Sequence, residues 1–408
     1  MDPPSADHDE RAAPSRRTAQ RDESRLGRRA FLGGAAAAPW LGIGTEASQP
    51  PDQSREPTFP GLIVRESEPL NLEYPFATLD GFLTPNEHFY IRNHFAIPSL
   101  DSTTWRLRVE GAVETPTVFD SAELRRMPSR TITVMLECAG NGRIFLVPKA
   151  KGLLWESGAV GNAEWTGVPL SSVLDRVGIK SAAVEVVLEG HDSGEIPEEP
   201  KSPGMIPFAR SLPIEKARRD VLLAYQMNGR DLSPSHGFPL RAIVPGWYGM
   251  ASVKWLKRIL LVERPFAGYF QTLDYAYFER QHGIPSLVPL TENQVKAQIA
   301  RPARQEVVPK GRDYRVHGAA WAGESTVAKV EISTDGGKTW AEATLTGTAV
   351  PHAWRLWEWT WRVPNAAGPG SMMARATDAR GRVQPLTRDT DRRAVMINHL
   401  VPVELEIR

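Results

Sequence analysis

The sequence predicts an α+β fold, with a mixed α+β domain at residues 86–295 followed by an immunoglobulin-like β-sandwich at residues 296–408. In the first domain, short strand-like segments are mixed with short amphipathic helices, without a regular strand–helix–strand repeat. The sandwich is indicated by strands that follow one another at intervals of roughly 8–14 residues without intervening helices. The 33 glycines and 34 prolines also favour turns and short strands over long helices.

The composition is that of a globular protein large enough for two or three domains. Of the 408 residues, 41% are hydrophobic and 24% are charged, values that disfavour disorder for most of the chain. The 49 Lys and Arg residues almost balance the 48 Asp and Glu residues, which argues against a nucleic-acid-binding function. No apolar run reaches the roughly 18 residues of a membrane-spanning helix, so we expect no integral membrane segment.

Residues 1–47 are interpreted as an export signal with a disordered extension, because residues 1–26 are polar and charged with almost no apolar periodicity. An arginine pair at 28–29, the following Phe31-Leu32 and a short Ala- and Gly-rich stretch are typical of a twin-arginine signal. We therefore expect export to the periplasm in the folded state; the alternative is a basic tail with a low-complexity linker. Residues 48–85, rich in proline and charge, are expected to form an extended arm.

The hydrophobic pattern of the first domain predicts short elements in a mixed order. Period-two alternation at residues 105–109 indicates a half-buried strand. Ser121 as the N-cap predicts a helix at 121–127, and a terminal glycine closes an amphipathic helix at 169–178. The remaining apolar runs are expected to be strands, at residues 131–136, 184–188, 220–225 and 240–244.

The C-terminal region reads as strands separated by turns. They are expected at residues 314–321, 328–334, 339–345, 354–363 and 372–378. The run at 354–361 holds four of the twelve tryptophans, and on a strand Arg355 shares one face with Trp357, Trp359 and Trp361. A core strand explains the tryptophans but not the arginine, which indicates a partner, an interface or a ligand at that position.

The only cysteine, Cys138, follows a buried strand and opens the segment Cys-Ala-Gly-Asn-Gly-Arg. One cysteine excludes an intrachain disulfide and a c-type haem attachment. A lone thiol is by default an inert core residue, but this loop is too polar and glycine-rich for a core. The thiol is then either a ligand for a soft metal or a nucleophile. His94, His191 or His236 would provide a base, so a cysteine hydrolase stays open at this point.

Residues 137–143 and 151–155 (ECAGNGR and KGLLW) resemble the molybdenum-binding core of the sulfite oxidase family. Three further segments resemble that family in the same order, at residues 89–94, 220–241 and 246–255. The C-terminal strands, with STDGGKTW and AWRLWEW, resemble the family's dimerisation domain. The resemblance spans roughly residues 80–405, and its specificity lies in the five motifs occurring together.

The resemblance implies a molybdenum–molybdopterin cofactor with Cys138 as the protein thiolate on the metal. It implies that the cofactor is bound by Tyr90, Ile91, Arg92, Asn93, His94, Cys138, Asp192, His236, Arg241, Ser252, Val253 and Lys254. It implies that the catalytic pocket contains Arg92, Cys138, Arg143, Lys151, Tyr275 and Arg355. Several cations and one hydroxyl donor suit a small dianion such as sulfite.

The activity implied is oxidation of sulfite to sulfate by oxygen-atom transfer, in a homodimer. Because no haem domain is present, the electrons are expected to pass to a separate acceptor such as a cytochrome c, or to oxygen. Two departures from the family pattern stand out. Gly142 occupies a position where many relatives carry a basic residue, and an acidic, proline-rich loop at 194–205 is expected near the pocket mouth.

Other substrates and another function class remain open from the sequence. The same cofactor would also serve a protein-bound sulfane sulfur, a nitrate-like oxyanion or methionine sulfoxide, although a neutral sulfoxide does not need so many cations. In a different class, the chain would be a non-catalytic binding protein with a degenerate enzyme domain. The presence of Cys138, His236, Arg241 and Arg355 argues against that interpretation.

Overall fold

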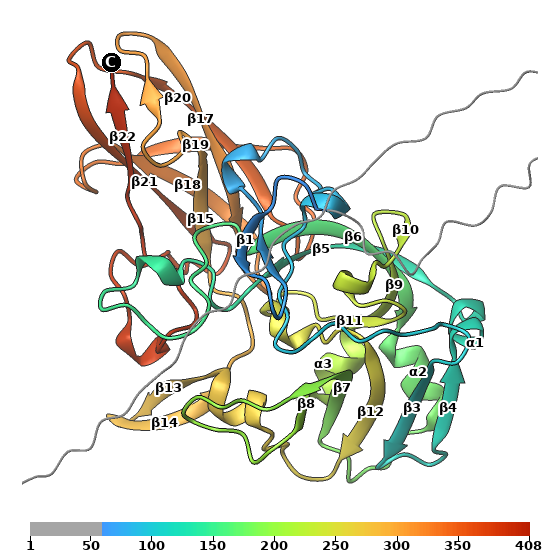
Figure 1. Ribbon diagram of the computed structural model, residues 1–408. Helices are drawn as coiled ribbons and strands as arrows, with labels where there is room; N and C mark the ends of the chain where they lie inside the picture. The colour runs from blue at the N-terminus through green and yellow to red at the C-terminus, as the bar shows by residue number, and fades with distance from the viewer. Residues whose placement is uncertain (1–58) are drawn as a thin grey trace, which may run out of the picture. The chain divides into compact units, whose positions relative to one another are not determined.

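The computed structural model describes residues 59–408, and this part of the chain is mostly β-sheet (Figure 1). Its three α-helices are six to eight residues long: α1 (Ser121–Arg126), α2 (Leu170–Val177) and α3 (Ile214–Arg219). Helix therefore contributes less than the expected α+β class implies. The expected export signal at residues 1–47 lies outside the described residues. No helix among residues 59–408 combines the length and the apolar character needed to cross a membrane.

The described part of the expected arm, residues 59–85, forms a small hairpin instead of a fully extended segment. It consists of β1 (Ile63–Glu66) and β2 (Asn71–Glu73), which pair in antiparallel register. Leu72 of β2 also forms a backbone bridge with Ile91. The buried Glu73 carboxylate accepts hydrogen bonds from the backbone N–H groups of Glu156 and Gly158, at 3.1 and 2.6 Å. The arm is thus anchored to the segment that follows the Cys138 loop.

One sheet of the first domain places Cys138. It contains β5 (Arg130–Glu137), β6 (Val160–Pro169), β9 (Leu222–Met227), β10 (Arg230–Asp231) and β11 (Arg241–Ile243). β5 pairs antiparallel with β6 over the whole length of β5, from Arg130 opposite Gly167 to Glu137 opposite Val160. Cys138 is therefore the first residue beyond the end of a buried strand, as the sequence predicts.

The second sheet has the order β4-β3-β12-β7-β8 and carries the main core of the first domain. Its strands are β3 (Arg106–Gly111), β4 (Thr117–Asp120), β7 (Glu185–Gly194), β8 (Ile206–Pro213) and β12 (Leu256–Val262). The sequence does not predict β4, β8 or β12, nor β6 and β10 in the first sheet. The cap of α1 is also one residue earlier than expected, because the Asp120 side chain accepts from Glu123 N in a capping box.

The C-terminal strands form one continuous hydrogen-bonded path in the order β15-β17-β20-β19-β18-β21-β22-β16 (Figure 1). They are β15 (Lys296–Arg301), β16 (Val307–Val308), β17 (Asp313–Trp321), β18 (Val327–Ser333), β19 (Ala341–Thr346), β20 (Arg355–Arg362), β21 (Gly368–Asp378) and β22 (Val403–Ile407). Trp357 and Trp361 lie in their core. The all-β character is confirmed, and an immunoglobulin-like topology stays a prediction. The hairpin β13 (Ala276–Gln281) and β14 (Ile284–Pro289) precedes this domain.

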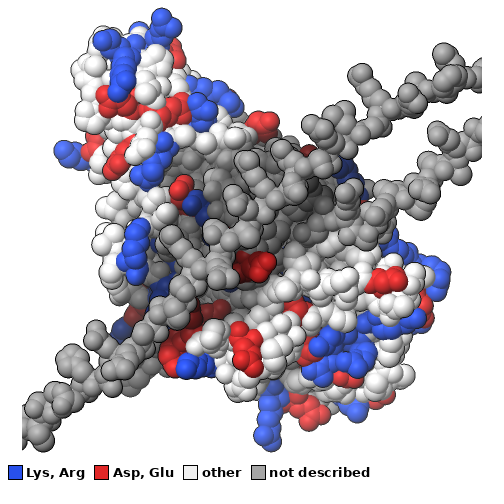
Figure 2. Space-filling model, in the orientation of Figure 1, with Lys and Arg blue, Asp and Glu red and all other residues white. Residues whose placement is uncertain are grey.

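The visible surface of residues 59–408 shows acidic and basic side chains interspersed, without one broad face of a single sign (Figure 2). This distribution matches the near balance of 49 basic and 48 acidic residues. Several charged side chains are buried inside the first domain, among them Asp192, Arg210 and Arg241.

Candidate functional site

The Cys138 loop is held from both sides by hydrogen bonds. Cys138 N donates to Ala159 O at 2.8 Å, and Asn141 N donates to Cys138 O at 2.9 Å, which closes a turn. The Asn141 side chain donates to Glu137 Oε1 and accepts from Ala159 N, each at 3.1 Å. Cys138 itself is only 6% exposed and lines a cavity. The loop is therefore rigidly placed, with its thiol turned towards a recess in the first domain.

Positions 140 and 142 of this loop each favour glycine, for a different steric reason. A β-carbon at Gly140 would lie 2.4 Å from Arg143 Nη2, so only glycine allows the guanidinium to fold back over the loop. Gly142 has φ +97°, a left-handed conformation that favours glycine, and a β-carbon there would approach Ile397 at 3.1 Å. The loop conformation thus explains a glycine at 142, where the family pattern suggests a basic residue.

The cavity that contains Cys138 gathers most of the predicted site residues from distant parts of the sequence. Twelve of them line it: Tyr90, Ile91, Arg92, Asn93, His94, Cys138, Asp192, His236, Arg241, Ser252, Lys254 and Tyr275. They come from the loop before β3, the end of β5, β7, the turn after β10, β11 and the segments around β12. Their convergence depends on the pairing of both sheets, which no local pattern reveals.

Two basic side chains that line the cavity are held by backbone carbonyls. Arg241 Nη1 and Nη2 donate to His236 O and Ser252 O at 3.0 and 3.1 Å. Lys254 Nζ donates to Ser235 O at 2.9 Å and to the Asn93 side chain. Burial lowers the pKa of Arg241 to about 10, so this side chain still carries its positive charge near neutral pH. These side chains provide the cavity with fixed positive charge.

Burial controls the protonation of two further groups in the cavity, His236 and Asp192. It lowers the pKa of His236 to about 3, and the nearby Arg241 and Lys254 act in the same direction, so the imidazole is neutral. Burial raises the pKa of Asp192 to about 7, although the positive charge of Lys254 opposes the change. The cavity therefore offers cations together with a carboxyl group that exchanges its proton near neutral pH.

The cavity lining also contains the pair His94 and Tyr275. His94 Nε2 and Tyr275 Oη share a hydrogen bond of 2.6 Å, and His94 stacks on Phe208 of β8 with ring centroids 4.5 Å apart. Burial, followed by Arg92 and Lys254, lowers the pKa of His94 well below its ordinary value. Burial likewise raises the pKa of Tyr275. Both partners are therefore uncharged near neutral pH, and they hold a proton between them.

Two arginines, Arg92 and Arg143, add positive charge that acts on His94 and Tyr275. Arg92 lines the cavity and donates to Asn93 O. Arg143 is held by Ala394 O and Leu153 O at 3.0 and 2.9 Å, and its charge acts on both Tyr275 and His94. The site thus combines one thiol, one phenol and several fixed cations, an arrangement that suits a small anionic substrate beside a soft metal.

Comparisons with known proteins agree with this arrangement. Sulfite oxidase from Gallus gallus is 36% identical over 359 residues, which are 83% of this chain and 76% of the relative. The chain belongs to the sulfite oxidase family. Family models for the oxidoreductase molybdopterin binding domain and for the Mo-co oxidoreductase dimerisation domain match residues 94–270 and 288–406. The expected family and its molybdenum–molybdopterin cofactor are confirmed, and the chain is a molybdoenzyme of the sulfite oxidase type.

Two further relatives show the range of the sulfite oxidase family. The mitochondrial sulfite oxidase from Mus musculus is 36% identical over 344 residues, 80% of this chain and 62% of the mouse protein. The crystal structure of the sulfane dehydrogenase SoxCD from Paracoccus pantotrophus matches with a TM-score of 0.72 and 28% identity. That match covers 89% of this chain and 92% of the neighbour. Membership of the family therefore does not by itself distinguish sulfite from a sulfane substrate.

The cavity has the chemical features that a pterin cofactor with a phosphate group needs. Asp192 Oδ1 and Arg241 Nε are buried and have no hydrogen-bond partner within the protein. Buried polar atoms usually have a partner, and an unpaired acceptor and an unpaired donor that line the same cavity are available to a polar ligand. A phosphate would bind the cations, and ring N–H groups would donate to the Asp192 carboxylate. The residues present therefore fit the cofactor.

Four of the predicted site residues lie outside the lining of this cavity. Val253 is 1% exposed in the apolar core of the first domain, and its carbonyl accepts from Ala242 N. Lys151 is exposed on the loop after Arg143. Arg355 begins β20 of the C-terminal domain, where its Nε atom is buried without a hydrogen-bond partner. Arg143 does not line the cavity, but its positive charge acts on Tyr275 and His94, which do. The roles assigned to these four side chains stay predictions.

Sequence reasoning missed two arginines that surround the Tyr275 segment. The Asp274 carboxylate lies within electrostatic reach of Arg92, Arg143, Arg210 and Arg393. Arg393 Nη1 donates to Leu273 O and Ala276 O, at 2.8 and 2.9 Å. Nothing in the charged run 388–393 distinguishes this arginine from its neighbours. Arg210 does have a signal, because it occupies an inward position of a strand whose other inward residues are apolar.

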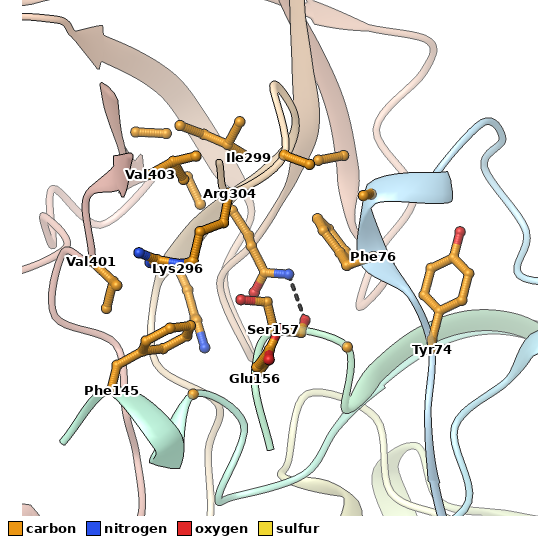
Figure 3. Close-up of a pocket in the computed structure, with 18 of the residues that line it drawn as sticks. Tyr74, Phe76, Phe145, Glu156, Ser157, Lys296, Ile299, Arg304, Val401 and Val403 are labelled. Atoms are coloured by element: carbon orange, nitrogen blue, oxygen red, sulfur yellow. Dashed lines mark hydrogen bonds between the residues drawn. The ribbon is translucent and has the colours of Figure 1, made fainter. Parts of the chain in front are cut away.

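A second cavity of about 280 Å³ is lined in part by Gly142 of the Cys138 loop, and Figure 3 shows other residues that line it. Apolar side chains of the arm and the C-terminal domain surround it, among them Phe76, Ile299 and Val403. On its wall, Lys296 of β15 donates to Glu137 Oε1 at 2.9 Å, directly before Cys138. Gln298 Nε2 donates to Ser157 O at 2.5 Å. The C-terminal domain thus holds the Cys138 loop.

Proposed function

We propose that this enzyme oxidises sulfite to sulfate by oxygen-atom transfer and passes the electrons to a separate acceptor. The observation that carries the proposal is the position of Cys138 in the same cavity as Arg92, His94 and Tyr275. In the overall reaction, sulfite and one water molecule become sulfate, two protons and two electrons. The acceptor has to take the two electrons, for which a cytochrome c is suitable.

Cys138 would ligate the molybdenum, and Asp192, His236, Arg241 and Lys254 would hold the pterin. The bound cofactor supplies the redox chemistry and the oxygen-atom transfer. The side chains of the protein bind and orient the reactants. Arg92 lies in the lining and Arg143 beside it, and both attract the sulfite dianion with fixed charges. Tyr275 Oη donates to a substrate oxygen or to His94 Nε2, so that a proton is held next to the substrate.

The quaternary structure and location are part of this proposal. The match to a dimerisation domain over residues 288–406 supports a homodimer formed through the C-terminal β-domain. We also propose an immunoglobulin-like topology for this domain. The arginine pair at 28–29 and the Ala- and Gly-rich stretch that follows support export by the twin-arginine route to the periplasm.

The test is sulfite-dependent reduction of ferricyanide or of added cytochrome c by protein with a measured molybdenum content. We expect saturable reduction that depends on both sulfite and bound molybdenum. The Cys138→Ser variant, purified in the same way, is the control for reduction by free sulfite. Molybdenum-loaded protein that reduces neither acceptor with sulfite would contradict the proposed substrate and leave the cofactor assignment intact.

A protein-bound sulfane sulfur is the second candidate substrate, supported by the structural similarity to SoxCD. The acidic loop at residues 194–205 is linked to the chain just before Tyr275, because Tyr269 Oη donates to Pro200 O at 2.6 Å. We therefore propose that a protein that carries the substrate would contact this loop. Turnover of a persulfide-bearing carrier protein, faster than turnover of free sulfite, would favour this alternative.

A further inference from the structure

Arg210 is a fully buried cation on the inner face of β8. It is 0% exposed, and its neighbours on that face, Phe208 and Leu212, belong to the apolar core. A charged side chain at such a position costs folding free energy unless it is well bonded. Arg210 does not line the cofactor cavity, so contact with the cofactor does not explain it.

The Arg210 guanidinium bonds to both sides of the segment that carries Tyr275. Its Nη1 donates to Phe270 O, at the start of a π-helical turn (Phe270–Asp274), and its Nη2 donates to Leu290 O at 2.6 Å. Leu290 N in turn donates to Tyr275 O at 2.8 Å. The carbonyls before and after Tyr275 are therefore fixed by one side chain, and π-helical turns are frequent at functional sites.

The same strand also places the hydrogen-bond partner of Tyr275. Phe208, two residues before Arg210, stacks on His94, which bonds to Tyr275 Oη. Ser211 N donates to the Gln271 side chain at 3.2 Å, a further link from β8 to the π-helical turn. The Arg210 guanidinium carbon lies 6.0 Å from the Tyr275 ring centroid, within the range of a cation–π interaction.

We infer that Arg210 is a positioning residue for Tyr275, which sets the place of the phenol relative to His94 through two carbonyl bonds and a buried positive charge. The kinetic consequence rests on the proposed function, because it requires Tyr275 to act on the substrate. The structural consequence does not: without Arg210 the segment 268–290 should open more easily than the rest of the first domain.

Amide hydrogen exchange on molybdenum-loaded protein tests the structural consequence directly. We expect faster exchange confined to peptides from residues 268–290 in Arg210→Lys and Arg210→Met. The control Lys216→Met also removes a buried cation, one that donates to Pro245 O and pairs with Asp220 and Glu324. It should leave residues 268–290 unchanged. Unchanged exchange there in both Arg210 variants, or an equal increase throughout the domain, would overturn the inference.

A double-mutant cycle with Tyr275→Phe tests whether Arg210 acts through the phenol. We expect Arg210→Lys to lower kcat about tenfold when Tyr275 is present and less than about twofold in the Tyr275→Phe background. Equal losses in the two backgrounds would overturn the inference. If the wild-type protein holds molybdenum but does not turn over sulfite, the proposed substrate fails and the exchange experiment still decides the role of Arg210.

Discussion

Two cavities border the Cys138 loop, a front cavity that Cys138 lines and a rear cavity that Gly142 lines. They are built from different kinds of contact. The front cavity contains buried polar atoms without partners, including Asp192 Oδ1 and Arg241 Nε. The rear cavity also has such an atom, His399 Nδ1, but the charged groups next to Cys138 are paired there within the protein, Lys296 with Glu137 at 2.9 Å. Unpaired buried groups indicate a place for a ligand, whereas a buried ion pair indicates an anchor. The loop therefore borders a candidate ligand site at Cys138 and is anchored by an ion pair at Glu137.

The largest effect expected on the front side is that of Cys138→Ser. Replacing the soft thiolate by a hydroxyl should lower sulfite-dependent turnover by a factor on the order of a thousand. The cavity otherwise keeps its pterin-binding side chains, so the variant should retain most of the bound pterin. Turnover per bound molybdenum and the pterin content are the two measurements. Wild-type turnover in this variant would remove Cys138 from the metal and abolish the distinction between the two cavities.

On the rear side, Lys296→Met should destabilise the protein by about 3–5 kcal/mol, because Glu137 is left buried without its cation. Glu137 is 2% exposed and would keep only the hydrogen bonds from Trp321 and Asn141. Gln298→Ala is the control from the same wall, and it should cost only about 1 kcal/mol. Urea unfolding of both variants gives the comparison. Equal losses of stability would show that the ion pair is no stronger an anchor than a single amide.

The unusual protonation of Asp192 predicts a pH effect specific to the front cavity. Its pKa of about 7 in the folded protein exceeds the ordinary value of 3.8, because burial disfavours the carboxylate. The folded state therefore binds more protons than the unfolded state between these values. The stability of the cofactor-free protein should fall as pH rises from about 4 to about 7, by at most about 1.4 kcal/mol per pH unit.

Asp192→Asn should remove this contribution, so the difference in unfolding free energy between wild type and variant isolates it. The comparison with the variant is needed because His236 also makes the unfolding free energy depend on pH. Its pKa is lowered to about 3 in the folded protein, so its contribution to stability rises with pH up to about 6.5, opposite to that of Asp192. Urea unfolding at several pH values measures both proteins. A constant difference between them over this range would contradict the protonated state of Asp192.

The smallest effect is expected for Arg355→Met. Arg355 lies on β20 and does not belong to the lining of the front cavity, so we expect the KM for sulfite to change less than about twofold. Arg92→Met, which removes a cation from the lining, should raise KM about tenfold or more by loss of a charge-assisted contact. A large increase for Arg355→Met would extend the substrate pocket to the C-terminal domain.

The sequence anticipates the front cavity much better than the rear one. Its motifs point to Cys138, Asp192, His236 and Arg241, which all meet in one cavity. The strands β6, β8 and β12 were missed because glycine, proline or charged residues interrupt their apolar patterns. For the same reason Arg210, on β8, was overlooked. The rear anchor went unnoticed because Lys296 and Glu137 are far apart in the chain, and no local pattern relates them.

From the sequence by itself, the resemblance of five motifs implied the family and the cofactor, and adjacent residues determined the strand–loop presentation of Cys138, because local backbone geometry is encoded in neighbouring residues. Only the tertiary structure decided which charges meet. It joined Lys296 to the residue before Cys138, placed Arg210 behind Tyr275 and kept Lys151 out of the cavity. The physical reason is that burial and pairing of a charge depend on strands brought together by sheet formation, and Lys296 and Glu137, for example, are 159 residues apart in the sequence.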